Sequence, residues 1–137
     1  MNTDRLLHTI AVARKMVEIA KEKNLSEQQQ RELFLLGYNH DVGYEYKVEG
    51  EEHQQTGGKL LRDNGYKYWQ EVYYHGLPDA PYESEYLLIL NQADMQINKY
   101  GNDVGYDKRL HDIEERYGRD SIPYQNSKKL IDQIKNK

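Results

Sequence analysis

The sequence predicts an all-α protein that folds as a single domain. Apolar residues recur at spacings of three and four along most of the chain, whereas the alternation of β-branched residues that is typical of strands is scarce. A length of 137 residues suits one domain and leaves little room for a second. We found neither an internal repeat nor a low-complexity tract, so residues 1–137 are expected to form one folding unit.

The first half of the chain contains four predicted helices. Thr3 or Asp4 can cap the first of them. Ser26, followed three residues later by Gln29, forms a capping-box signal for the second. Gly65 is suited to follow the end of the third, because glycine adopts the left-handed conformation found there. The four helices are expected at about 4–20, 26–41, 51–64 and 66–75, with a polar loop over 43–50.

The second half begins with a loop over residues 76–81, which contain a glycine and two prolines. A long fifth helix is expected over 83–100, and Gly101 and Gly105 then interrupt the helical pattern. Two shorter helices follow at 107–117 and 123–136. The sequence therefore predicts a bundle of six to seven helices.

Composition excludes several classes of function. The 19 Lys and Arg against 23 Asp and Glu give a net charge of −4, which argues against a nucleic-acid polymer as partner. The chain contains no cysteine, which excludes disulfides, thiolate zinc sites and cysteine nucleophiles. The longest apolar run, 86–90, is far too short for a membrane span, and charged residues in the first fifteen positions argue against a signal peptide. We therefore expect a cytoplasmic protein without a membrane partner.

Several polar residues fall where the helical pattern predicts a packed face. Four of the five histidines lie on such a face or at a helix end, namely His8, His40, His53 and His75. Asp41 follows the second of them directly, and Asp94 lies on the apolar stripe of the fifth helix. Each residue alone has an ordinary explanation, either a hydrogen-bonded core histidine or, for Asp94, a buried salt bridge. Because a buried carboxylate is costly unless it is paired or bound to a cation, the six together could instead be metal ligands.

The same residues, in this order, resemble the HD-domain superfamily of metal-dependent phosphohydrolases. The segment 5–8, Arg-Leu-Leu-His, followed by an apolar helix is similar to the first motif, and 35–43 with its His-Asp pair is similar to the signature motif. His53 with 57–61 resembles the third motif, and 92–94 resembles the closing aspartate. The resemblance covers about 3–100, which would form the core of the metal site, with C-terminal helices at 107–136. It implies a compact helical bundle of the HD type.

The resemblance also implies a metal centre. Four residues match the ligands of the basic mononuclear site: His8, His40, Asp41 and Asp94. His53 and His75 match two further ligands of the dinuclear branches, in which the aspartate of the His-Asp pair bridges both ions. We therefore expect two divalent ions with Asp41 between them. Imidazole and carboxylate ligands suit iron or manganese, with zinc or magnesium as alternatives.

The reaction that the resemblance implies is hydrolysis of a phosphoester or phosphoanhydride in a nucleotide or a small phosphorylated metabolite. A metal-activated water would be the nucleophile, with His40 and Asp41 as the catalytic pair. A dinucleoside polyphosphate is one candidate substrate. Arg5 and Lys47 are candidate phosphate-binding residues. The chain departs from a common family pattern at Tyr44, because a basic residue often follows the His-Asp-apolar-Gly run there.

The sequence leaves two other functions open. A minority of the superfamily are di-iron oxygenases with a similar ligand set, and a metal-binding helical module without catalytic activity is the third hypothesis. The expected partner of the first hypothesis is a small phosphorylated substrate. A tyrosine-rich stretch over 66–74 could in addition mediate a homodimer.

Overall fold

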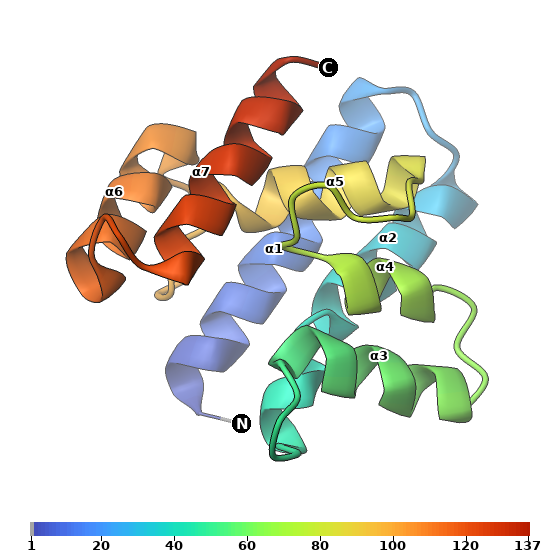
Figure 1. The fold of residues 1–137 in the computed structure, drawn as a ribbon. Helices are drawn as coiled ribbons and strands as arrows, with labels where there is room; N and C mark the ends of the chain where they lie inside the picture. Colours follow the sequence, from blue (N-terminus) through green and yellow to red (C-terminus); the bar gives the residue numbers. More distant parts are fainter. Residues whose placement is uncertain (1) are drawn as a thin grey trace.

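The computed structural model describes residues 2–137 and confirms the all-α fold. This part of the chain contains seven α-helices, whose arrangement is drawn in Figure 1, and one short 3₁₀ helix, η1. The elements are α1 (Thr3–Glu22), α2 (Glu27–Asn39), η1 (Val42–Glu45), α3 (His53–Asp63), α4 (Trp69–Tyr74), α5 (Glu85–Asp94), α6 (Gly105–Tyr117) and α7 (Ile122–Lys135).

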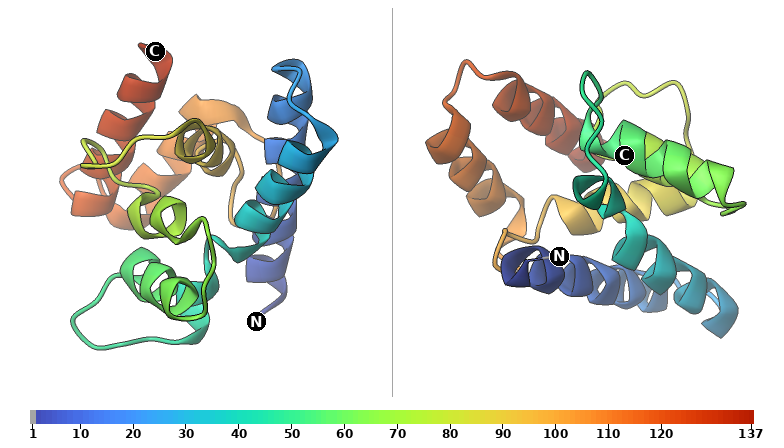
Figure 2. Two further views of the ribbon diagram at one scale, coloured as in Figure 1. Left: turned by 90° about the vertical axis from the view of Figure 1, so that its right-hand side faces the viewer. Right: turned by 90° about the horizontal axis from the view of Figure 1, so that it is seen from below.

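The centre of the bundle is formed by α1, α2 and α5. Helices α1 and α2 pack against each other along their length, and α5 crosses them (Figures 1 and 2). The main apolar core lies between these three helices and α4, and its fully buried side chains include Val12, Met16, Leu33, Leu36, Val72, Ile89 and Leu90. The apolar spacing therefore predicts most of the packed residues of α1, α2 and α5, although Leu6 and Leu7 of α1 and Phe34 of α2 are exposed.

Two pairs of helices flank this centre on opposite sides. Helices α3 and α4 pack together on one side, with η1 against α3, and α6 and α7 form an antiparallel pair on the other (Figure 1). A second, smaller core joins the end of α5 to α7 through Met95, Leu130, Ile131 and Ile134. The first pair brings side chains toward the centre of the molecule, whereas the second covers the C-terminal end of α5.

Glycines permit the closest approaches between these elements. A Cβ atom at Gly43 would lie 1.8 Å from the carbonyl oxygen of His53, so only glycine allows η1 to lie against the start of α3. A Cβ atom at Gly58 would lie 2.6 Å from Cβ of Tyr73 in α4. The glycine pair at 57–58 thus serves packing. It is not part of a phosphate-binding loop, because the upstream glycine and the Ser or Thr after the lysine that such a loop requires are missing.

The fifth helix is shorter than the sequence predicts. We expected it to run to residue 100, but α5 ends at Asp94 and Met95 is its C-cap. The chain then turns back on itself, because the side chain of Asn98 accepts hydrogen bonds from the backbone N–H groups of Tyr100 and Asn102. An isolated bridge between Ile97 and Asp103 closes this turn. The turn places Asp94 at a helix end rather than within a helix.

The other boundaries differ by a few residues from those predicted. The capping box of Ser26 and Gln29 at the start of α2 is confirmed, and the side chain that caps α1 is that of Asn2. Helix α4 begins at Trp69 instead of residue 66, since the chain first passes through Gly65 with φ of +79° and a short turn. Within residues 2–137, no helix combines the length and the apolar character that a membrane span requires.

We predict that Gly37→Ala destabilises the protein. The added Cβ atom would lie 2.7 Å from Cα of Ala13 and 2.8 Å from Sδ of Met16, so α1 and α2 would have to separate. Overpacking of this kind costs about 1–3 kcal/mol, and a thermal melt of the variant would show a lower midpoint. Gln28→Ala on the exposed face of α2 is the control and should change stability by less than about 0.5 kcal/mol.

Candidate metal centre

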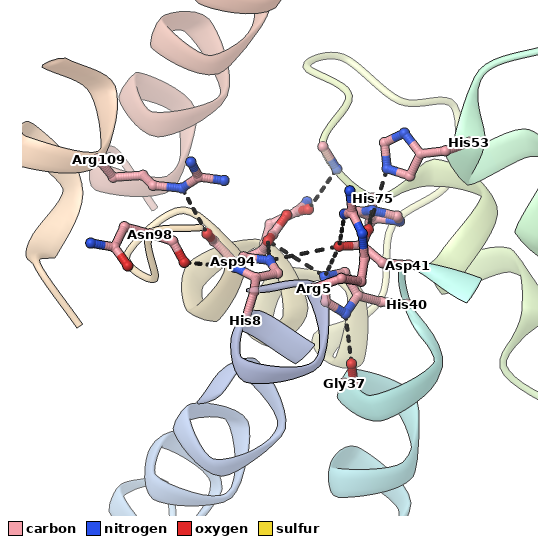
Figure 3. Close-up of polar contacts among 12 residues, drawn as sticks. Arg5, His8, Gly37, His40, Asp41, His53, His75, Asp94, Asn98 and Arg109 are labelled. Atoms are coloured by element: carbon pink, nitrogen blue, oxygen red, sulfur yellow. Dashed lines mark hydrogen bonds and ion pairs between the residues drawn. The ribbon is translucent and has the colours of Figure 1, made fainter. Parts of the chain in front are cut away.

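Six side chains from five different segments converge at one place in the bundle (Figure 3). Most of them lie at helix ends, where a side chain can turn toward the space between elements. His8 lies in α1, His40 is the C-cap of α2 and Asp41 follows it, His53 begins α3, His75 is the C-cap of α4, and Asp94 ends α5. The structure therefore brings together all six residues that the sequence analysis selected as ligands.

The two carboxylate oxygens of Asp41 face different pairs of histidines. Oδ2 lies 3.2 Å from Nε2 of His40 and 3.7 Å from Nε2 of His8. Oδ1 lies 3.3 Å from Nε2 of His53 and 3.4 Å from Nε2 of His75. One carboxylate thus stands between two groups of nitrogen atoms, as a bridging ligand would.

Asp94 completes one of these two groups. Its Oδ1 lies 3.0 Å from Nε2 of His8 and 3.5 Å from Nε2 of His40. The ligand atoms form three overlapping groups, each within 4.8 Å, that could hold an ion: His8, His40 and Asp41; His40, His75 and Asp94; and Asp41, His53 and His75. Each of these groups could therefore hold a metal ion.

Three of the histidine rings are oriented by backbone carbonyl groups. Nδ1 of His8 donates to the carbonyl of Asn98 at 3.0 Å, and Nδ1 of His40 and of His75 each donate at 2.6 Å to the carbonyl three residues earlier. A carbonyl only accepts, so Nδ1 carries the proton in each ring and Nε2 is the atom that points into the cluster. Metal-binding histidines in proteins are characteristically held in this way by a hydrogen bond from the other ring nitrogen.

Burial and mutual attraction strongly perturb the ionisable groups of the cluster. Burial alone would raise the pKa of Asp41 and of Asp94. The facing histidines lower each pKa by more than burial raises it, so both pKa values lie well below the usual range. Burial alone lowers the pKa of His40, but the two carboxylates raise it well above its usual value. Burial, together with the nearby His75, lowers the pKa of His53. Both aspartates therefore remain ionised and need positive charge beside them.

The ring nitrogens and carboxylate oxygens of the cluster are not all satisfied by hydrogen bonds, and a bound cation would satisfy them. His8 faces acceptors on both sides of its ring, the Asn98 carbonyl and Oδ1 of Asp94, which requires either a second proton or a cation next to Nε2. Nε2 of His40 is fully buried and makes no hydrogen bond with any residue in 2–137. Imidazole nitrogens and carboxylate oxygens that converge in this way fit a transition-metal ion.

Arg5 and Tyr44 lie at the rim of the cluster. Nη1 of Arg5 is 3.5 Å from Oδ2 of Asp41, and the Arg5 side chain is 28% exposed, so it is partly accessible from solvent. The guanidinium carbon lies 3.4 Å from the centre of the Tyr44 ring. Burial and the Asp41 carboxylate raise the pKa of Tyr44 to about 12, so its hydroxyl group keeps its proton at neutral pH.

Other candidate residues lie outside the cluster. Lys47 is exposed in the loop between η1 and α3. Two further basic side chains of α3 form ion pairs away from the cluster, Lys59 with Glu51 at 3.3 Å and Arg62 with Asp63 at 3.3 Å. The fifth histidine, His111, is exposed on α6 and pairs with Glu115.

Three residues that support the ligands were not identified from the sequence. Nε of Arg109 in α6 donates to the backbone carbonyl of Asp94 at 3.4 Å, and Asn98 supplies the carbonyl that orients His8 (Figure 3). Oδ1 of Asn91 accepts from the backbone N–H of Gly76 at 2.9 Å, which fixes the chain just after His75. The one sequence signal among them was a polar residue, Asn91, among the apolar residues of α5.

Comparison of the chain with models of protein families, with curated proteins and with solved structures gives no match. The likeness to the HD-domain superfamily thus rests on the motif residues, and the case for a metal centre rests on the geometry of the six side chains.

We predict that divalent metal stabilises the protein more strongly as the pH rises. The raised pKa of His40 stabilises the metal-free protein. This contribution is complete below a pH of about 6.5, the ordinary pKa of histidine, and is lost as the pH rises through the pKa of His40 in the folded state. Metal binding has the opposite pH dependence: affinity increases as the pH rises, because the histidine ligands must lose their Nε2 protons. At a metal concentration 100 times the Kd, the gain is about 2.7 kcal/mol, which corresponds to a rise of about 10 °C in Tm.

The measurement is the Tm of chelator-treated protein between pH 6 and 9, with and without Mn²⁺. His111→Ala should respond to the metal as the unaltered protein does, since its exposed ring lies outside the cluster. A metal-induced shift that stays the same at every pH, or that is absent, would contradict the prediction.

Proposed function

We propose that the protein is a metal-dependent phosphohydrolase of the HD-domain type. It would hydrolyse a phosphoester or phosphoanhydride bond of a nucleotide or a small phosphorylated metabolite, with water as the nucleophile. The observation that carries the proposal is the position of Asp41, whose two oxygens face separate pairs of histidines. A carboxylate in this position suits two ions held side by side, and paired ions are a recurrent solution for phosphoryl transfer.

The ligands favour iron or manganese, with zinc or magnesium as alternatives, because the set combines four imidazoles with two carboxylates and no thiolate. Two such ions, when bound, lower the pKa of water and offset negative charge on a phosphoryl oxygen. His8, His40 and Asp94 would hold one ion, His53 and His75 the other, and Asp41 both.

The protein's own groups would orient the reactants. The hydrogen bonds from Nδ1 of His8, His40 and His75 fix the direction of each Nε2 atom, so the ligands need little rearrangement. Asp41 and Asp94 stay ionised and supply two of the negative charges that neutralise the cations. Burial of these side chains excludes bulk water from the inner side of the cluster, whereas the partly exposed His53 marks the side that opens to solvent.

Arg5 is the group best placed to bind the phosphate of a substrate. Its guanidinium group lies beside the cluster, on the side where the site meets solvent, and a guanidinium forms paired hydrogen bonds with phosphate oxygens. The ion pair that it makes with Asp41 is long, at 3.5 Å, so exchange of this partner for a phosphate oxygen costs little.

The direct test is a hydrolysis screen of phosphomonoesters, nucleotides and dinucleoside polyphosphates, with protein loaded with Mn²⁺, Fe²⁺ or Zn²⁺. We expect release of phosphate or of a nucleotide from at least one class. Metal-loaded protein that releases no product from any class would contradict the proposal. Consumption of O₂ by the iron-loaded protein without hydrolysis would favour an oxygenase instead.

We predict that Asp41→Asn abolishes both tight metal binding and hydrolysis. The amide is isosteric with the carboxylate, but it lacks the charge and cannot offer two anionic oxygens to two groups of ligands. Activity should fall by at least about 1,000-fold, which is more than 4 kcal/mol of lost transition-state stabilisation. Elemental analysis should find less than one tightly bound ion per chain, whereas the control His111→Ala keeps the full amount.

We predict that Arg5→Ala raises KM for the substrate by about ten- to a hundredfold. A charge-assisted hydrogen bond to phosphate contributes about 1.5–3 kcal/mol, and the metal ligands remain in place. Arg14→Ala, on the exposed side of the same helix, is the matched control and should leave KM unchanged. If the two variants have the same KM, Arg5 does not bind the substrate.

A further inference from the structure

Tyr44 lies between Arg5 and His53. The guanidinium carbon of Arg5 is 3.4 Å from the centre of the Tyr44 ring, and the centre of the His53 ring is 4.0 Å away with an interplanar angle of 17°. Two groups this large cannot both lie within 4 Å over the same face, so they cover opposite faces. Tyr44 is therefore the middle layer of a three-part stack, and neither face of its ring remains free for a nucleobase.

His53 differs from the other three histidines of the cluster in how its ring is held. His8, His40 and His75 are each oriented by a hydrogen bond from Nδ1 to a backbone carbonyl. The ring of His53 lies instead parallel to Tyr44, and its side chain is 27% exposed, compared with 7% or less for the other three. The stack on Tyr44 thus orients the ring of His53, as the backbone carbonyl groups orient the other three rings.

The same ring would keep Arg5 in place once the cluster binds cations. In this structure Arg5 is attracted by the Asp41 carboxylate at 3.5 Å. A metal ion on that carboxylate would neutralise the attraction and repel the guanidinium group. A cation over an aromatic face retains about 0.5–2 kcal/mol of attraction, which depends on the ring and not on the carboxylate. Tyr44 thus offers Arg5 a contact that metal binding leaves intact.

The backbone on either side of Tyr44 fixes the position of its ring. The preceding residue, Gly43, approaches so closely that any Cβ atom there would lie 1.8 Å from the carbonyl oxygen of His53. The backbone N–H of Tyr44 donates to the carbonyl of Asp41 at 3.1 Å within η1. The direct approach of η1 to the first residue of α3 sets the two rings face to face.

We propose that Tyr44 is a positioning residue that holds both Arg5 and His53. This inference rests on the proposed function, because it takes Arg5 as the phosphate-binding group and His53 as a ligand of the second ion. One aromatic ring would then link the two, so that the second ion and the phosphate of the substrate each depend on the same stack. In the HD-type pattern that the chain resembles, a basic residue often stands at position 44. Tyr44 would instead act through Arg5, which it holds in place.

The experiment compares Tyr44→Ala, Tyr44→Phe and Tyr44→Leu with the unaltered protein. The first readout is metal per chain by elemental analysis after loading with Mn²⁺, and the second is the affinity of the loaded protein for inorganic phosphate by calorimetry. Tyr44→Ala and Tyr44→Leu should lower the metal content from about two ions to about one, and weaken phosphate binding by about three- to tenfold. Tyr44→Phe keeps the stack and should retain both properties.

Tyr46→Ala is the matched control, because this exposed tyrosine lies two residues further along the same segment. It should bind metal and phosphate as the unaltered protein does. If Tyr44→Ala melts at a lower temperature, the comparison of Tyr44→Leu with Tyr44→Phe decides, since both place a large apolar side chain at this position and only Tyr44→Phe keeps an aromatic face.

The proposal is overturned if Tyr44→Leu keeps two ions and the original affinity for phosphate, or if Tyr44→Phe loses as much as Tyr44→Leu. It is also overturned if the unaltered protein binds fewer than two ions. Failure of the proposed function has a different signature, in which the unaltered protein binds two ions and phosphate but hydrolyses no substrate. Neither readout requires enzymatic activity, so the two failures are distinguishable.

Discussion

The arrangement of the bundle depends on two ionised carboxylates inside a small helical core. Asp41 and Asp94 are 8% and 7% exposed, and an unpaired carboxylate at such depth would be strongly unfavourable. In the metal-free chain the raised pKa of His40 favours a positive charge beside both carboxylates, and bound cations would compensate their charge more completely. The helices therefore have to bring these six side chains together, whatever else the fold achieves.

Helix ends make this convergence feasible. A side chain in the middle of a helix must share its face with apolar neighbours, whereas one at an end can turn toward the gap between elements. His40 and His75 are C-caps, His53 begins a helix and Asp94 ends one. At the C-terminal ends, carbonyl groups of the last turn accept the Nδ1 protons of His40 and His75 in addition to the backbone N–H of the same residue. Helix termination and ligand orientation therefore have the same physical origin.

Close backbone contacts then set the distances within the centre. Gly37 lets α2 approach α1, and Gly43 lets η1 approach α3, so that segments bearing different ligands meet without intervening side chains. The turn after α5 contributes in another way, because it directs the carbonyl of Asn98 toward His8. The stability of the fold and the geometry of the candidate metal centre are thus linked, since the same close contacts support both.

The sequence alone determined the all-α class, most helix positions, the capping box at Ser26 and the six candidate ligands, because these follow from local periodicity and residue chemistry. It overextended the fifth helix, because the apolar spacing did not reveal the local turn in which the Asn98 side chain accepts hydrogen bonds from the backbone of Tyr100 and Asn102. Only the tertiary structure decided how Asp41 divides its oxygens between histidine pairs and that Tyr44 lies between Arg5 and His53. Such contacts join residues up to 90 positions apart, as between His8 and Asn98, and local patterns carry no information about them.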